Sequence, residues 1–278
     1  MSPLVSTDWL AAHLNEVRVV DASWYMPGDK REPGHEFLAA HIPGAVFFDI
    51  DAIADHATDL PHMMPTPGVF AEAARALGLS DADTLVVYDG AGVFSAPRVW
   101  WALRAMGHDN VFVLDGGLLK WQREGRAIES GAGAPKPGDF QARPVAALAR
   151  DYDAVRAHLA AGDAQIVDAR SASRFTGEEK EPRPGLKSGH MPGAVNLPWR
   201  ALLTHENTLK DDDALRALFA GKGIDLRAPI VTTCGSGISA AIVMLALVKI
   251  GARDVALYDG SWAEWGSRAG APVACIAG

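Results

Sequence analysis

The sequence has very little cysteine, no long apolar run and no excess of positive charge. Its only cysteines among 278 residues are Cys234 and Cys275, which excludes a disulfide framework and favours a reducing compartment. The most apolar run, 240–248, is far shorter than the ~20 residues of a membrane-spanning helix. Acidic residues outnumber basic ones by 34 to 26, the opposite of the balance typical of proteins that bind nucleic acids or membrane surfaces.

The N-terminal stretch 1–14 lacks the basic and apolar regions of a secretory signal. Apolar residues make up 49% and charged residues 22%, which is ordinary globular composition. The sequence therefore predicts a cytoplasmic globular protein with neither a nucleic-acid nor a membrane partner.

What the sequence does contain is an internal repeat. Three blocks recur in the same order about half a chain later: HIPGAVFFDI (41–50) as HMPGAVNLPW (190–199), VVDAS (19–23) as IVDAR (166–170), and LDGGLLKW (114–121) as YDGSWAEW (258–265). Between the copies, 129–150 is rich in proline and glycine and is typical of an exposed linker. We predict domains at 1–130 and 146–278, joined by a linker at 131–145.

Each copy alternates strand-like and helix-like segments. Short β-branched runs predict strands at 17–20, 84–88, 111–114, 165–167, 230–233 and 254–258. Helical patterns lie between them at 69–77, 96–106, 152–160, 214–220 and 238–250. This alternation predicts an α/β fold in which a mostly parallel sheet has helices on both faces and ligands bind beyond the carboxyl ends of the strands.

Cys234 opens the most informative segment, Cys-Gly-Ser-Gly-Ile-Ser-Ala at 234–240. A strand, a glycine-rich turn and a helix start direct successive backbone N–H groups at one point, which favours an anion and hence a thiolate. A buried structural thiol would explain the apolar strand but not this polar cradle, so we interpret Cys234 as a nucleophile. Cys275, in the tail, has no such cradle and is interpreted as incidental.

Other cysteine chemistries do not fit this loop. A cysteine-dependent phosphatase needs an arginine six residues after the cysteine, where this sequence has Ala240. No second cysteine lies two or three positions away, which excludes dithiol exchange and a zinc site. No Gly-Lys-Ser/Thr follows, which excludes a phosphate-binding P-loop.

FLAAHIPGAVFF (37–48) and VALYDGSWAEW (255–265) resemble the two sequence signatures of the rhodanese superfamily, and the resemblance covers nearly the whole chain. It implies two rhodanese-like domains with the catalytic cysteine only in the second. The first copy has Asp89 near the cysteine position and resembles the inactive domain of such tandem proteins. His41 and His190 recur in both copies, so we interpret them as structural.

Within this family the loop resembles that of the sulfurtransferases that use 3-mercaptopyruvate. Gly235 and Ser236 provide no cation beside the thiol, whereas the enzymes that use thiosulfate typically carry basic residues there to hold the dianion. Ser239 stands where threonine is common and keeps the hydroxyl. The resemblance implies that substrate is lined by Gly235, Gly237, Ile238 and Ser239.

The segment 174–185 resembles the one that supplies two substrate-holding arginines, here Arg174 and Arg183. A guanidinium suits an α-keto carboxylate, although a solvated charged loop is the alternative reading. The segments 47–51 and 61–65 resemble those that lend Asp51 and His62 to the site. With Ser236 they imply a Ser-His-Asp arrangement.

The resemblance thus implies sulfur transfer from 3-mercaptopyruvate through a Cys234 persulfide to a thiol or cyanide, with pyruvate released and no metal or organic cofactor. Thioredoxin is one acceptor of the required thiol class. Two alternatives stay open: a thiosulfate:cyanide sulfurtransferase, and a non-catalytic sulfur carrier or redox sensor that uses the same thiol.

Overall fold

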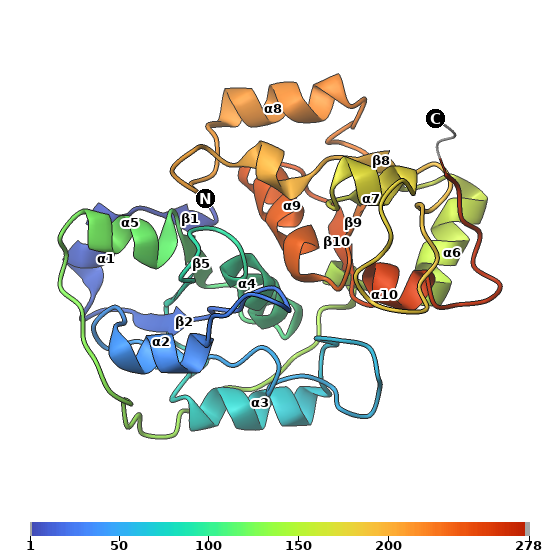
Figure 1. Cartoon of the computed structure of the whole chain (residues 1–278). Coiled ribbons are helices and arrows are strands. Elements are labelled where there is room, and N and C mark those ends of the chain that lie inside the picture. The colour runs from blue at the N-terminus through green and yellow to red at the C-terminus, as the bar shows by residue number, and fades with distance from the viewer. Residues whose placement is uncertain (1, 276–278) are drawn as a thin grey trace. The chain divides into compact units, whose positions relative to one another are not determined.

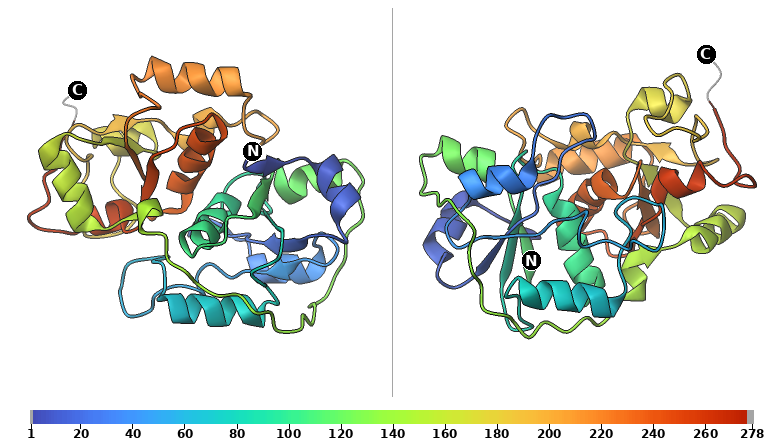
Figure 2. Two further views of the ribbon diagram at one scale, coloured as in Figure 1. Left: turned by 180° about the vertical axis from the view of Figure 1, so that it is seen from behind. Right: turned by 60° about the horizontal axis from the view of Figure 1, so that its bottom comes forward.

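The computed structural model describes residues 2–275 in two units that repeat one sheet topology (Figure 1). Unit 1 comprises Met64–Val145, Thr204–Leu209 and the described residues up to His56; unit 2 comprises Ala57–Met63, Ala146–Leu203 and the described residues from Lys210 onward. Each unit holds a five-stranded parallel sheet with helices on both faces (Figure 2). The α/β class and the two copies of a parallel sheet predicted from the sequence are confirmed.

Unit 1 has the strand order β1-β5-β4-β2-β3. Its elements are β1 (Leu4–Val5), α1 (Thr7–His13), β2 (Arg18–Asp21), α2 (Pro33–Ala39), β3 (Val46–Phe47), α3 (Pro67–Ala76), β4 (Leu85–Tyr88), α4 (Ala96–Ala105), β5 (Val111–Leu114) and α5 (Gly117–Arg123).

Unit 2 has the equivalent order β6-β10-β9-β7-β8. Its elements are the 3-10 turn η1 (Ala146–Leu148), β6 (Ala149–Arg150), α6 (Tyr152–Ala161), β7 (Gln165–Asp168), α7 (Ala172–Thr176), β8 (Val195–Asn196), the 3-10 turn η2 (Trp199–Leu202), α8 (Asp212–Gly221), β9 (Ile230–Thr233), α9 (Ile238–Lys249), β10 (Val255–Tyr258) and α10 (Ser261–Trp265).

The central strands are continuous apolar runs because both faces of a parallel sheet are covered. Every residue of β4, β9 and β10 is buried. The sequence predicts these three strands from such apolar runs, and the predicted and observed bounds agree within one residue at each end. The edge strands β1, β3, β6 and β8 have two residues each, too few to show any periodicity, and sequence reasoning missed them.

Each sheet packs into a core of its own. In unit 1, a cluster around Leu10, Val86 and Trp121 is fully or nearly fully buried. In unit 2, Trp262 and Trp265 of α10 occupy the equivalent core and have no exposed surface. The two signature blocks of the sequence therefore supply core residues, namely Phe37, Ile42 and Ala45 in unit 1 and Trp262 and Trp265 in unit 2.

The segment 131–145 runs along the outside of unit 1 beside α3 (Figure 2). Its backbone is hydrogen-bonded to that unit, since Phe140 N–H donates to the Leu79 carbonyl and Val145 N–H to the Ala105 carbonyl. Phe140 has no exposed surface. The composition of this segment suggested that all of it is exposed. Phe140 differs, because its buried side chain anchors the segment to unit 1.

None of the helices in the described part of the chain is long and apolar enough to cross a membrane.

Candidate active site

Cys234 stands at the carboxyl end of the central strand β9, just before α9. Its side chain is 2% exposed, and the Gly237 N–H donates to its Sγ at 3.2 Å. Gly237 has φ +83°, a left-handed conformation that glycine adopts without steric cost, and it caps α9. The chain therefore turns over the sulfur directly after the strand and places a backbone donor against it.

The residues that begin α10 hold this loop from outside. The Ser261 hydroxyl accepts a hydrogen bond from the Cys234 N–H at 3.2 Å. The Trp262 N–H donates to the Cys234 carbonyl oxygen at 2.9 Å, and the Ala263 N–H donates to the Gly235 carbonyl oxygen at 2.9 Å. The backbone of Cys234 and Gly235 is thus fixed by contacts within unit 2.

Arg174 of α7 lies over the same loop. A Cβ at Gly235 would stand 3.0 Å from Arg174 Nη2, so any side chain at position 235 would press against the guanidinium. The Arg174 side chain is 15% exposed. A cation therefore lies beside the residue that follows Cys234, although it comes from another segment of the chain.

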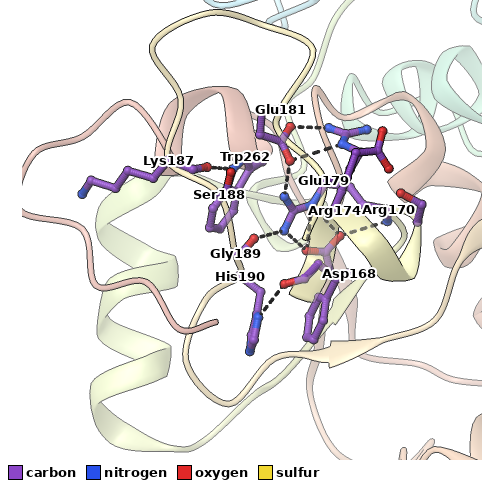
Figure 3. A network of polar contacts seen from close by, with 12 residues as sticks. Asp168, Arg170, Arg174, Glu179, Glu181, Lys187, Ser188, Gly189, His190 and Trp262 are labelled. Atoms are coloured by element: carbon purple, nitrogen blue, oxygen red, sulfur yellow. Dashed lines mark hydrogen bonds and ion pairs between the residues drawn. The ribbon is translucent and has the colours of Figure 1, made fainter. Parts of the chain in front are cut away.

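A chain of buried ion pairs holds Arg174 in place (Figure 3). Glu181 accepts hydrogen bonds from Arg174 Nε at 3.2 Å and from Arg170 Nη1 at 2.7 Å. Arg170 also donates to both carboxylate oxygens of Asp168 and to the Gly189 carbonyl oxygen. The side chains of Asp168, Arg170 and Glu181 are each 1% exposed. Because the charges alternate along this network, each buried ion has a counter-ion.

Arg170 is the fixed cation of this network. Burial alone would lower its pKa, but the charges and hydrogen bonds of Asp168 and Glu181 raise the pKa of Arg170 above its usual value. Its guanidinium also lies 4.1 Å from the centre of the Trp262 ring. Arg170 therefore supports Glu181 from behind, and Arg174 is the member that faces Gly235.

Glu181 engages one side of the Arg174 guanidinium. Its two oxygens accept from Nε and Nη2, whereas Nη1 has no hydrogen-bond partner among the described residues. A guanidinium carries five N–H groups in a fixed plane, and two neighbouring ones match the two oxygens of a carboxylate. Arg174 can therefore bind a small carboxylate at its free end while Glu181 holds its stem.

The other candidate substrate residues of unit 2 lie on the cysteine loop or close to α7 in sequence. Ser236 is 7% exposed and Ile238 is 3% exposed, while Ser239 is half-buried in the first turn of α9. Arg183 is half-buried on the segment between α7 and β8. The structure thus brings Arg174 to the cysteine loop, and the roles of Arg183 and Ser236 stay predictions.

Asp51 and His62 come from the first half of the sequence. Asp51 belongs to unit 1, where its Oδ2 accepts a hydrogen bond from Trp24 Nε1 at 2.9 Å. His62 belongs to the segment Ala57–Met63, which groups with unit 2, and it is 8% exposed with φ +60°. A left-handed backbone is costly for a non-glycine residue, and such strain clusters at functional sites.

The corresponding loop of unit 1 is filled by its own carboxylate. Asp89 follows β4 as Cys234 follows β9, and it has no exposed surface. Its oxygens accept backbone N–H groups from Ala91, Phe94 and Ala96, each at 2.8 Å. An anion therefore already occupies the cradle of the copy that the sequence predicts to be inactive.

The histidines of the HIPGA and HMPGA blocks make the same contacts in both units. His41 Nδ1 lies 2.8 Å from the Phe37 carbonyl oxygen, and the two rings stack at 4.2 Å. His190 Nδ1 lies 2.7 Å from the Phe175 carbonyl oxygen, and those rings stack at 3.8 Å. These packing contacts explain why the block recurs whether or not a thiol is present.

Cys275 is exposed, and its Sγ lies 3.6 Å from the Ser188 carbonyl oxygen. Within residues 2–275, no group of three or more His, Cys, Asp or Glu side chains is placed to hold a metal ion.

Sequence reasoning missed four residues of this site: Asp168, Arg170, Glu181 and Ser261. A signal was present in the differences between the two copies. Where VVDAS has Ser23, IVDAR has Arg170; where LDGG has Gly117, YDGS has Ser261. A substitution that separates a copy with a thiol from one without it is a candidate functional position.

Both halves of the chain match the family model described as a rhodanese-like domain, at residues 6–124 and 151–268. The chain belongs to the rhodanese family. The 3-mercaptopyruvate sulfurtransferase of Escherichia coli K12 is 47% identical over 274 residues, which cover 97% of this chain and 96% of that protein. The thiosulfate sulfurtransferase of Bos taurus is 42% identical over 275 residues, with 96% and 92% covered.

Solved structures agree with this assignment. The crystal structure of the Escherichia coli 3-mercaptopyruvate sulfotransferase SseA superposes with a TM-score of 0.87 at 44% sequence identity. The superposition covers 94% of this chain and 99% of that chain. The similarity therefore extends over both units.

Proposed function

We propose that the chain is a sulfurtransferase that takes sulfur from 3-mercaptopyruvate and passes it through a Cys234 persulfide to a thiol or to cyanide. One observation carries the proposal. A buried thiol accepts a hydrogen bond from a backbone N–H, and the Arg174 guanidinium lies one residue away, beside Gly235, with its Nη1 not engaged by Glu181. The identity of 47% to a protein with this activity supports it.

In the first half-reaction the Cys234 thiolate attacks the sulfur of the donor. The new S–S bond forms as the donor's C–S bond breaks, and the electron pair of that bond stays on carbon as the enolate of pyruvate. The proton of the donor thiol moves to that carbon, which completes pyruvate. The outer sulfur remains on Cys234 as a persulfide anion, and the loop N–H groups are suited to hold it.

The arginines bind the part of the donor that does not react. Arg174 and Arg183 hold the carboxylate and the carbonyl oxygen, and their charge stabilises the enolate that forms. Ser236, His62 and Asp51 move the proton from sulfur to carbon, with histidine as the natural carrier near neutral pH. The backbone and side chains of Gly235, Gly237, Ile238 and Ser239 line the donor.

In the second half-reaction an acceptor thiolate attacks the outer sulfur. The S–S bond to Cys234 breaks, its electron pair returns to Cys234, and the acceptor leaves as a persulfide; cyanide leaves as thiocyanate. The scheme is ping-pong and uses neither a metal nor an organic cofactor. Thioredoxin has the required thiol, and the cytoplasm, the compartment we propose, keeps such thiols reduced.

The choice of donor rests on charge. Mercaptopyruvate carries one carboxylate some atoms from its sulfur, which one guanidinium end can bind. Thiosulfate carries its charge beside its sulfur; Gly235 and Ser236 provide no cation there, and the Arg174 guanidinium that lies beside Gly235 is paired with Glu181 through its Nη2. The 42% identity to a thiosulfate sulfurtransferase keeps thiosulfate as the second candidate donor.

Comparison of kcat/KM for the two donors, with cyanide as the common acceptor, tests the proposal. We expect mercaptopyruvate to be preferred, and Cys234→Ser to release no pyruvate. Cys275→Ser is the matched control and should keep wild-type turnover. Mass spectrometry after donor treatment should show a single added sulfur that Cys234→Ser lacks. A preference for thiosulfate would overturn the donor assignment, and slow turnover despite the adduct would indicate a carrier or sensor.

A further inference from the structure

The two units hold the loop at the carboxyl end of the central strand with the same backbone contact. In unit 2 the Trp262 N–H donates to the Cys234 carbonyl oxygen at 2.9 Å. In unit 1 the Leu118 N–H donates to the Asp89 carbonyl oxygen at 3.0 Å. The loops can therefore be compared residue by residue, and unit 1 serves as an internal reference for unit 2.

The units differ at the residue just before this contact. Unit 1 has Gly117 there with φ +52°, and unit 2 has Ser261 with φ +48°. Glycine adopts this left-handed conformation freely, but the Cβ of serine makes it unfavourable. Ser261 therefore has a strained backbone at a position where the equivalent residue of unit 1 is glycine.

The Ser261 side chain makes two hydrogen bonds. Its hydroxyl donates to the Tyr258 carbonyl oxygen at 2.9 Å and accepts from the Cys234 N–H at 3.2 Å. It has no exposed surface. The hydroxyl is therefore oriented by one contact and orients the backbone of the nucleophile through the other.

The two loops also differ in the hydrogen bonds that their backbone N–H groups make to the side chain that follows the central strand. In unit 1 the Asp89 carboxylate accepts three loop N–H groups and so organises its loop from within. In unit 2, among residues 2–275, the Cys234 side chain accepts a loop N–H from Gly237 alone, at its Sγ. A thiol is a weak acceptor and cannot organise the loop as a carboxylate does.

We propose that Ser261 is a positioning residue that holds the Cys234 loop open from outside. Its hydroxyl replaces the internal carboxylate as the organiser of the loop, which leaves the loop N–H groups available to the sulfur that Cys234 carries. The inference rests on the proposed function in one respect only, namely that Cys234 carries a transferred sulfur as a persulfide. This role explains why the strained backbone of Ser261 is retained, since strained residues persist where function requires them.

The test uses the full chain with Cys275→Ser, so that Cys234 is its one cysteine, and two variants of Ser261. Ser261→Gly removes both the hydroxyl and the strain, while Ser261→Ala removes the hydroxyl and keeps the Cβ. Ser267→Ala is the matched control, because Ser267 is exposed two residues after α10 and its hydroxyl donates to the Glu264 carbonyl. Thermal unfolding shows whether each variant is folded.

We expect both Ser261 variants to lose about tenfold in kcat with KM for mercaptopyruvate changed less than about twofold, because the loop acts on the reacting sulfur and not on the carboxylate. The pH at which alkylation of Cys234 by iodoacetamide reaches half its maximal rate should rise in both. Ser261→Gly should unfold no earlier than the parent, since glycine suits this φ. Ser267→Ala should change neither kcat nor the alkylation profile.

The proposal is overturned if Ser261→Gly keeps the parental kcat and alkylation profile. It is also overturned if Ser261→Gly fails to fold, because Ser261 would then serve stability. Alkylation needs no sulfur donor, so it still decides the role of Ser261 if the parent releases no pyruvate from mercaptopyruvate. That last result would contradict the proposed function alone.

Discussion

The guanidinium of Arg174 lies directly beside Gly235, 3.0 Å from the point where a Cβ would stand. A larger residue at this position would press against a side chain that is distant in sequence, although the backbone of Gly235 itself is not left-handed. The pair links the two parts of the proposed chemistry. One residue adjoins the nucleophile, and the other offers its free Nη1 to a carboxylate.

Gly235→Ala should weaken donor binding and leave the fold intact. The new methyl group displaces the end of Arg174, and loss of a charge-assisted hydrogen bond corresponds to about a tenfold rise in KM for mercaptopyruvate. The free energy of unfolding should change by less than about 1 kcal/mol, because a flexible side chain gives way. Steady-state kinetics and urea unfolding measure the two effects.

Gly221→Ala is the control for this substitution. Gly221 ends α8, and a Cβ there meets nothing within 4 Å. It should keep the parental KM and stability. An unchanged KM in Gly235→Ala would mean that Arg174 does not bind the donor.

Glu181→Gln should affect both stability and donor binding. The buried carboxylate of Glu181 is shared by Arg170 and Arg174, so its neutralisation leaves two guanidinium groups with one carboxylate between them. Breaking a buried ion pair costs about 3 kcal/mol, and the released Arg174 should raise KM for mercaptopyruvate several-fold. Urea unfolding and steady-state kinetics on the same preparation check this.

Glu178→Gln removes the same charge from the exposed part of this segment and should alter neither quantity. If both variants behave alike, the ion-pair network does not position Arg174.

The sequence predicts the parts of this fold that are long and periodic. The central strands show continuous apolar runs, and α9 is an apolar helix that follows a glycine-rich turn. Cys234 and Arg174 could be named because each stands in a recognisable motif. Short helices such as α7 and α10 span five residues and have no periodicity to detect.

The supporting residues could not be predicted in the same way, because their partners are set by the tertiary structure. Arg170 and Glu181 are 11 residues apart and form an ion pair only when the segment after α7 folds back over β7. Ser261 begins α10, just after β10, and it meets Cys234 because β10 pairs with β9 in the sheet. In the sequence alone, a charged loop and a serine after a glycine are ordinary surface features.

Asp21 and Asp168 occupy equivalent positions of the repeat and should respond oppositely to neutralisation. Asp168 is paired with Arg170, whereas the residue at the equivalent place in unit 1 is Ser23, which carries no charge and donates its backbone N–H to Asp21. Asp168→Asn should lower the free energy of unfolding by about 3 kcal/mol at neutral pH. Asp21→Asn should leave it unchanged or raise it, as urea unfolding will show.

The effect of Asp21→Asn should depend on pH. Burial raises the pKa of Asp21 despite opposing hydrogen bonds from Ser23 and Tyr88. A carboxyl whose folded pKa is raised contributes stability that is complete below the unfolded pKa and is lost as pH rises through the folded pKa. The gain of Asp21→Asn over the parent should therefore shrink on acidification towards about pH 4. A gain that is constant with pH would contradict this.

Asp89→Ala should open the filled cradle of unit 1. The substitution removes the acceptor of three backbone N–H groups at a site with no exposed surface, and their loss should cost about 3–5 kcal/mol of unfolding free energy. Asp89→Asn keeps one acceptor oxygen and should cost less, about 2 kcal/mol. Formate, a carboxylate small enough for the vacated space, should raise the unfolding temperature of Asp89→Ala more than that of Asp89→Asn or the parent. Equal stabilisation of all three proteins by formate would show that the loop N–H groups do not form an anion cradle once the side chain is gone, and the contrast drawn between the two loops would fail with it.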